Sequence, residues 1–249
     1  MARQTGIIKL TGTLNGINLY TRQGKALARK AGGGFNSHDI KHKPSMKRVR
    51  ENSSEFGRCS RTKKHFNRAL RPFLCHHKDT TLHGRLMRLF TSLKKLDSVH
   101  ERGQRQVAEG IHTPMGIQLL KDFNFTPSCR VSSHLLANVT YNSAQRILHI
   151  ASLNIESLPF ASGATHMALT LGVLHFDFFT NRYELSVSTP AYIDKTQQGS
   201  DVYLQAAAPA LSGTCIAVMG VKFYQEVQGR YMVFKSKDAV GLSIIHVGN

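Results

Sequence analysis

The sequence predicts an α+β protein in which an N-terminal β-meander and a basic helical hairpin precede a mostly antiparallel β-sandwich. Glycine-punctuated β-prone runs open the chain, amphipathic helical patterns follow, and many short β-prone runs separated by turn residues fill the second half. With 249 residues, 41% of them hydrophobic, the chain is long enough to bury a sizeable core. The expected regions are a meander (1–31), a basic helical region (32–110), a connector (111–127) and a β-sandwich domain (128–249).

The meander is predicted from two turn signals. Asn15-Gly16 is typical of a type I′ hairpin turn, whose two central residues need positive φ, and Gln23-Gly24 separates the next two β-prone runs. Three strands this short are barely stable alone, so we expect the meander to dock on the rest of the chain or on a neighbouring molecule. The expected strands cover 6–14, 17–21 and 25–30, and Arg22, Lys25, Arg29 and Lys30 make one end of the sheet basic.

A flexible connection is expected from Gly32-Gly33-Gly34 to Lys43. A helical pattern then runs over about 45–74, with weak points expected at 52–54 and at Gly57. Pro72 should end or kink this helix. Phe66 and Leu70 share one face of the helix, and basic side chains line another, at Arg61, Lys64, Arg68 and Arg71.

The helical pattern over 80–97 is the most regular in the chain. Arg88 and Lys95 fall opposite its leucine stripe, and Arg85 flanks the stripe. Two amphipathic helices with basic outer faces predict a helical hairpin whose apolar faces pack together. The stripe consists of Leu82, Leu86, Leu89, Leu93 and Leu96, with Phe90 beside it.

Positive charge is concentrated in the first half of the chain. Residues 1–124 hold 25 Lys and Arg against 8 Asp and Glu, whereas residues 125–249 hold 8 against 7, giving net charges of +17 and +1. Such segregation predicts that the N-terminal half meets a polyanion or an acidic partner surface. The residues expected to contact the polyanion are Arg61, Lys64, Arg68, Arg71, Arg85, Arg88 and Lys95.

The pattern of the second half predicts an antiparallel β-sandwich. Its short β-prone runs are separated by turn residues such as Thr180-Asn181 and Gln228-Gly229. The expected strands are 129–140, 145–153, 165–178, 182–188, 202–208, 214–226, 230–236 and 241–247.

Motifs for chemistry are poorly represented, and we expect no catalytic residues, no cofactor and no bound metal. Cys75-His76-His77 could form a metal site with Cys59 or His65, but the usual two-residue cysteine spacing is missing. A catalytic triad leaves no sequence mark, so an enzyme stays a minor alternative. Without a standard secretory signal, an apolar span or paired cysteines, the chain is expected to fold in a cytoplasm with reduced thiols.

Three stretches carry a resemblance to a known family. They are TGIIKLTGTLNGINLY near the start, RVRENSSEFGRCS followed by RALRP in the first basic helix, and VKFYQEVQGRYMVFKSKDAVGLSIIHV near the end. Together they resemble a family of small uncharacterised proteins from Bacteroidota genomes. That family brings no established activity, cofactor or catalytic residues, so the resemblance implies no site.

Two functional hypotheses follow. The first is a non-enzymatic structural protein, a filament or particle subunit, that self-assembles through β elements while its basic helical face contacts a polyanion or an acidic neighbour. The alternative is a discrete nucleic-acid-binding protein, monomer or dimer, that uses the basic helices. Base-specific reading is not indicated, because zinc-finger spacing and an aromatic RNP-like strand are both missing.

Overall fold

The computed structural model describes residues 2–32 and 36–248. The chain divides into two compact units, Met1–Asn52 and Ser53–Asn249. The expected flexible connection falls partly on Gly33 and Gly34, which lie outside the described residues. Its remaining part is helical, with α1 (Ser37–His42) followed by the 3-10 helix η1 (Pro44–Met46).

The first unit holds a four-stranded antiparallel sheet in the order β1-β4-β3-β2. The Asn15-Gly16 turn has the predicted positive φ, 41° and 76°, and the Gln23-Gly24 turn has a similar conformation, with φ of 51° and 75°. The expected first strand is shorter, because residues 6–11 form a loop in which the Gln4 side chain bonds the amide and carbonyl of Leu10. The strands are β1 (Ala2–Arg3), β2 (Gly12–Leu14), β3 (Ile17–Arg22) and β4 (Lys25–Lys30).

Helix α2 (Lys47–Ala69) is continuous, so the weak points expected at 52–54 and Gly57 are wrong. Tertiary contacts override the low helix propensity there. The buried Glu55 side chain accepts hydrogen bonds from Lys94 and from the amide of Gly103, and the Cys59 thiol donates to the Phe90 carbonyl. The helix ends before Pro72, which lies in the first turn of α3 (Arg71–Leu74).

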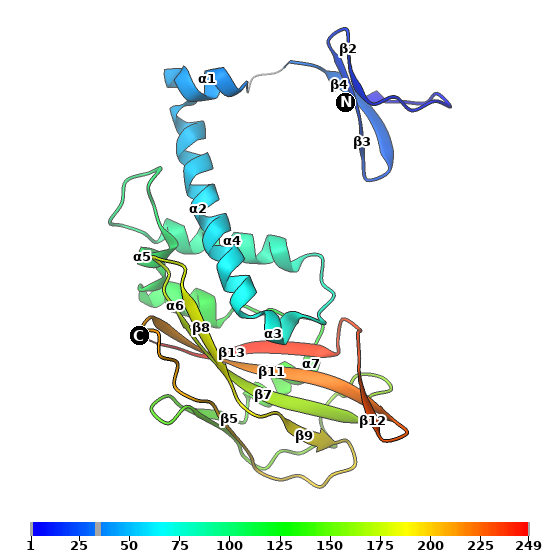
Figure 1. Ribbon diagram of the computed structural model, residues 1–249, viewed down its shortest axis with the longest axis vertical. Helices are drawn as coiled ribbons and strands as arrows, with labels where there is room; N and C mark the ends of the chain where they lie inside the picture. Colours follow the sequence, from blue (N-terminus) through cyan, green and yellow to red (C-terminus); the bar gives the residue numbers. More distant parts are fainter. Residues whose placement is uncertain (1, 33–35, 249) are drawn as a thin grey trace. The chain divides into compact units, whose positions relative to one another are not determined.

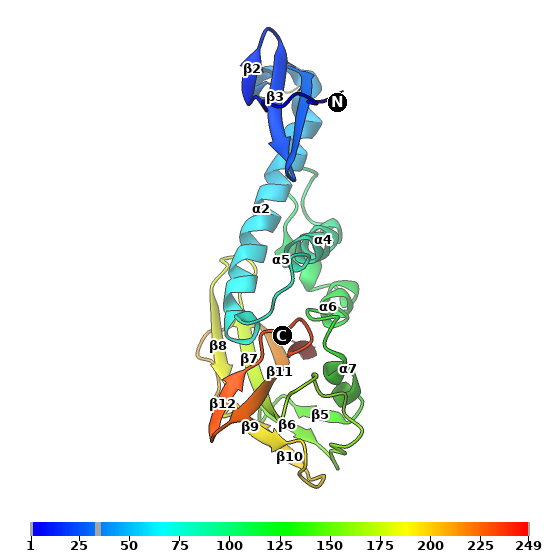
Figure 2. The ribbon, with the colours of Figure 1, turned by 90° about the vertical axis from the view of Figure 1, so that its right-hand side faces the viewer.

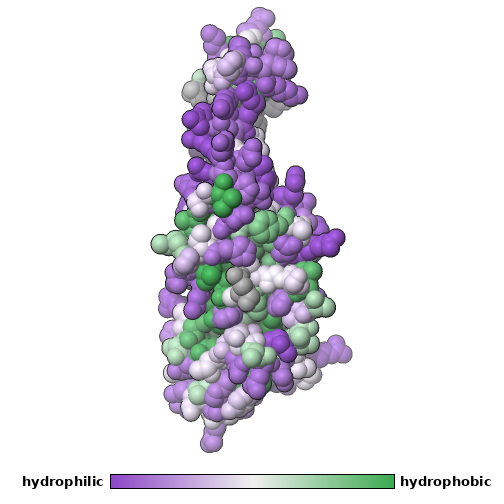
Figure 3. Space-filling view, turned by 90° about the vertical axis from the view of Figure 1, so that its left-hand side faces the viewer, coloured by the Kyte–Doolittle hydropathy of each residue, from purple (hydrophilic) through white to green (hydrophobic). Residues whose placement is uncertain are grey.

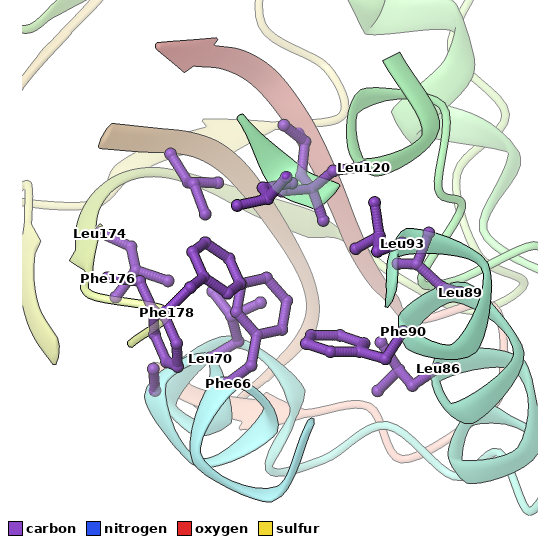
Figure 4. Packing of buried hydrophobic residues seen from close by; sticks show 14 of the residues in the cluster. Phe66, Leu70, Leu86, Leu89, Phe90, Leu93, Leu120, Leu174, Phe176 and Phe178 are labelled. Carbon is purple, nitrogen blue, oxygen red and sulfur yellow. The ribbon is translucent and has the colours of Figure 1, made fainter. Parts of the chain in front are cut away.

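The two predicted amphipathic helices pack together through their apolar faces in the second unit. Helix α4 (Leu82–Lys95) buries Leu86, Leu89 and Leu93 of the predicted stripe. The ring of Phe66 from α2 lies 5.5 Å from those of Phe90 in α4 and Phe176 in the sheet (Figure 4). These aromatic contacts join both helices to the sheet in one hydrophobic core.

A large and a small antiparallel sheet make up the β half of the second unit. The large sheet runs β12-β11-β7-β8, with β13 also paired to β11 and β9 to β7, and the small sheet has the order β10-β6-β5. The strands of the two sheets are β5 (Val139–Asn142), β6 (Ile147–Ile150), β7 (His166–Phe176), β8 (Tyr183–Val187), β9 (Ala191–Asp194), β10 (Val202–Gln205), β11 (Thr214–Val227), β12 (Arg230–Val233) and β13 (Val240–Gly248).

The large sheet is the middle layer of this unit. Alternate side chains of β11, such as Ile216 and Val218, join the core with the helices, whereas Ala217 and Met219 join a second core with the small sheet. Figure 1 shows the same order, from α4 through the large sheet to β5, and Figure 2 shows it from the side. The α+β prediction with a mostly antiparallel second half is confirmed.

Helix α3 packs on the large sheet with the ring of Phe73, and the Lys222 side chain of β11 donates to the Pro72 carbonyl of α3. Added Cβ atoms at Gly172 of β7 and Gly220 of β11 would lie 2.6 Å and 2.3 Å from atoms of the Phe73 ring. Both positions are therefore restricted to glycine by the close approach of this ring.

Further segments differ from the expected secondary structure. The strand expected over 129–140 is wrong for most of its length, because α7 (Arg130–Leu136) occupies it and buries Val131 and Leu135, four residues apart, in the second core. The segment 111–127, expected as a connector, follows α5 (Val107–Ile111) and contains α6 (Pro114–Lys121). The Thr113 side chain caps α6 by accepting from the Gly116 amide. Strand β9 was not predicted.

Candidate binding surfaces

The cationic face predicted on α2 is exposed to solvent. Arg61, Lys64 and Arg68 on α2 and Arg71 at the start of α3 are all exposed, while Phe66 and Ala69 point into the core. Within the described parts of the chain, none of these four cations forms a hydrogen bond or an ion pair through its side chain. Their charges are therefore available to a ligand. Figure 3 shows hydrophobic and hydrophilic side chains mixed over one face of the second unit.

The three cations predicted on α4 differ from one another. Arg88 and Lys95 are exposed, as expected for an outer face. Arg85 is not free: its guanidinium lies 2.6 Å from Asp79 and donates to the carbonyls of Asn124 and Phe125. These bonds hold the loop before α4 and the segment after α6 together, so Arg85 belongs to the scaffold rather than to the cationic face.

Three of the predicted cations line one pocket of about 450 Å³, between α2, α3 and the start of α4. Lys64 and Arg68 come from α2, one turn apart, and Arg71 follows from α3. Arg61, Arg88 and Lys95 lie outside it. The other described residues that line the pocket are Asn67, Leu74, Cys75, His77 and Leu82, so no carboxylate is among them.

His77 has an unusual environment in this pocket. Its side chain is 2% exposed, and neither ring nitrogen has a hydrogen-bond partner within the described structure. Its Nε2 lies 3.8 Å from Oδ2 of Asp79, which already accepts from Arg85. Burial and the nearby Arg85 charge lower the pKa of His77, although Asp79 raises it. The ring is therefore neutral at neutral pH, with one N–H donor and one acceptor unused.

Sequence reasoning did not connect His77 or Asn67 with the cations. The spacing of Lys64, Arg68 and Arg71 identifies one face of a helix, but the return of the chain after α3 brings His77 back onto that face. At the sequence level His77 entered only as part of a possible metal site, and the structure shows that its side chain is buried.

The sheet of the first unit has two chemically different faces. Residues opposite one another on paired strands point to the same side. The pairs Leu14 with Ile17 and Leu19 with Ala28 therefore form a largely apolar face, which also carries Lys30, opposite Ile17 at the end of β4. The opposite face is basic and carries Arg3, Arg22, Lys25 and Arg29, with the Arg29 guanidinium 5.5 Å from the centre of the Tyr20 ring.

The apolar face of this sheet is incompletely covered. Leu14 is 64% exposed and Ile17 48%, and Ile7, Ile8 and Leu10 in the loop before β2 are exposed as well. Among the described residues of the first unit, Ala26 is the one buried side chain, and α1 buries none. As far as residues 2–32 and 36–52 are concerned, the sheet therefore has no hydrophobic core inside its own unit.

The Cys-His combination considered for a metal does not come together. The Cys59 thiol is buried against α4, where burial raises its pKa to about 11, whereas Cys75 is exposed. Across residues 2–32 and 36–248, no group of three or more His, Cys, Asp and Glu side chains is placed to hold a metal ion. None of the helices in these two ranges has the length and apolar character needed to cross a bilayer.

Fold and surfaces together define an α+β protein with two surfaces of interest. One is the cationic face of α2 and α3, and the other is the N-terminal sheet, with a largely apolar and a basic face. Comparison with protein-family models, curated proteins and solved structures finds no match.

Proposed function

We propose that this chain is a non-enzymatic structural protein whose copies associate through the N-terminal β-sheet, while the basic helical face contacts a polyanion. The exposed apolar face of the first unit supports the assembly step most directly. A sheet of four short strands with Leu14 and Ile17 exposed and no core in its own unit is only marginally stable without a covering layer.

The faces of the sheet favour one kind of contact. Its edge strands β1 and β2 have two and three residues, which leaves little backbone for edge pairing with another chain. Two copies that meet through their apolar faces would pack as a sheet on a sheet, and their basic faces would point away from each other. We therefore assign the contact between copies to the apolar face, with a second copy as the occupant.

Light scattering coupled to size-exclusion chromatography on nuclease-treated protein tests the assembly. We expect a species larger than one chain in about 1 M salt, where charge contacts are screened within about 3 Å and apolar burial persists. Deletion of residues 1–31, or the double substitution Leu14→Ser and Ile17→Ser, should give a folded monomer. Thr13→Ala, on the basic face of the same strand as Leu14, should leave the species unchanged. A monomer at both low and high salt would contradict the assembly proposal.

A second candidate function is a discrete nucleic-acid-binding protein, favoured by the unpaired cations on α2 and α3. Phosphate contacts release counterions, so this binding should fall steeply as salt rises. A particle that is large only with nucleic acid at low salt, and a single chain after nuclease treatment, would support this function over assembly.

A further inference from the structure

We infer that the pocket between α2, α3 and α4 is a phosphate-binding site, in which Lys64, Arg68 and Arg71 supply positive charge and His77 donates a hydrogen bond. This inference rests on the polyanion contact in the proposed function and deepens it. It names one chemical group and one position on the basic face.

The charges of the pocket fit a phosphate. Three cations from two helices line one concave volume without a lining carboxylate, and within the described structure their side chains have no partners that would compete for the ligand. A phosphate oxygen accepts charge-assisted hydrogen bonds from Lys and Arg, and Arg can bind two oxygens at once. The exposed cations Arg88 and Lys95 lie outside this pocket.

His77 provides an independent indication of a ligand. A buried imidazole without a hydrogen-bond partner is destabilising, because its polar atoms are removed from water without compensation. His77 is among the residues that line the pocket, and both of its ring nitrogens are buried, so a rotation of the ring would bring an N–H to a bound oxygen. Asp79 is the nearest carboxylate to this ring, and its charge is compensated by Arg85.

The pocket can hold more than one phosphate group. Lys64 and Arg71 are seven residues apart on consecutive helical segments, so cations are spread along the pocket rather than gathered at one point. This arrangement suits successive phosphates of a nucleic-acid backbone, or two linked phosphates of a free small molecule. The phosphate chemistry is the same in both cases.

Two probes distinguish these sources. Inorganic pyrophosphate, followed by titration calorimetry and by the imidazole NMR signals of His77, tests the pocket alone. A fluorescent oligothymidylate of about twelve nucleotides, followed by anisotropy at low salt, tests the backbone. We expect both to bind, and we expect Arg68→Gln to weaken each about tenfold or more, as for the loss of a hydrogen bond to a charged group.

Matched variants keep the test decisive. His77→Asn should also weaken pyrophosphate binding, and because this position is buried, the exposed Arg68→Gln serves as the variant that preserves the fold. Arg88→Gln removes one exposed cation outside the pocket and should change pyrophosphate affinity less than twofold. Circular dichroism of each variant would report whether the fold is intact.

Each outcome decides between the claims. Unchanged His77 signals and no heat with pyrophosphate would overturn the phosphate site. Oligonucleotide binding that is lost in Arg88→Gln but kept in Arg68→Gln would overturn the pocket and leave the polyanion contact standing elsewhere on the basic face. Pyrophosphate binding in the pocket without oligonucleotide binding would keep the phosphate site, assign it to a free phosphorylated molecule and overturn the polyanion contact.

Discussion

The two units of this chain bury their side chains very differently. The second unit has two hydrophobic cores on either side of a six-stranded sheet, with Phe66, Phe90 and Phe176 fully buried. The first unit has a sheet of comparable regularity, yet Ala26 is the one side chain buried among its described residues. Correct strand pairing and turn geometry are therefore achieved in both, but only the second unit contains the apolar burial that stabilises a fold by itself.

The largest expected effect contrasts a core side chain with an exposed one. Phe66→Ala should lower the free energy of unfolding by about 3–5 kcal/mol, because it removes a ring packed against Phe90 and Phe176 and leaves a cavity. Leu14→Ala in the first unit should change it by about 0.5 kcal/mol or less, measured by urea denaturation of the dispersed protein. A comparable loss for Leu14→Ala would show that its side chain is covered within the chain.

An intermediate effect contrasts a buried ion pair with an exposed one. Glu55→Gln leaves the buried Lys94 without its charge partner, and we expect a loss of about 3 kcal/mol in the free energy of unfolding at neutral pH. Asp39→Asn removes the carboxylate partner of Lys43, a more exposed ion pair in the first unit, and should cost about 1 kcal/mol or less. Chemical denaturation of both variants measures the difference, and equal losses would contradict it.

The buried ion pair of Glu55 and Lys94 should also make stability depend on pH. Burial opposes ionisation of Glu55, but hydrogen bonds from Lys94 and the Gly103 amide lower its pKa below the ordinary 4.5. A group with a lowered pKa in the folded state stabilises the fold above its unfolded pKa, and that contribution is lost as pH falls through the folded pKa. Stability of the wild type should therefore decline below about pH 4.5 more steeply than that of Glu55→Gln.

The smallest expected change in stability is for two glycine-to-alanine substitutions in the second unit. Gly220→Ala brings a methyl group into the Phe73 ring and should destabilise by about 1–3 kcal/mol. Gly57→Ala, in an exposed part of α2 with no atom within 4 Å, should stabilise by about 0.5–1 kcal/mol. Thermal unfolding would show opposite shifts in Tm. A Tm of Gly220→Ala equal to or above that of the wild type would contradict the close packing of Phe73.

Periodicity and turn chemistry predicted most of this fold. The stripe of Leu86, Leu89 and Leu93, the Asn15-Gly16 turn and the long strands β7 and β11 follow from local patterns that tertiary structure did not alter. The error at α7 has a local cause. Val131 and Leu135 are compatible with a strand or a helix, and the core that selects the helix is made by residues distant in the sequence.

The candidate phosphate site was only partly predictable. Helical spacing was sufficient to group Lys64, Arg68 and Arg71, because neighbours on one face of a helix are fixed by its 3.6-residue turn. Helical spacing could not show that Arg85 forms an ion pair with Asp79, nor that His77 lines the same pocket. Both depend on the path of the loop between α3 and α4.

The contact between Phe73 and two glycines also constrains how this protein can change during evolution. A side chain acquired at position 220 or 172 would occupy space now filled by the ring, unless position 73 became smaller in the same lineage. We expect relatives to keep Phe73, Gly172 and Gly220 together or to change them together. A set of homologous sequences would then show these three positions, up to 147 residues apart in the chain, as a co-varying group, and that covariation would record where α3 meets the sheet.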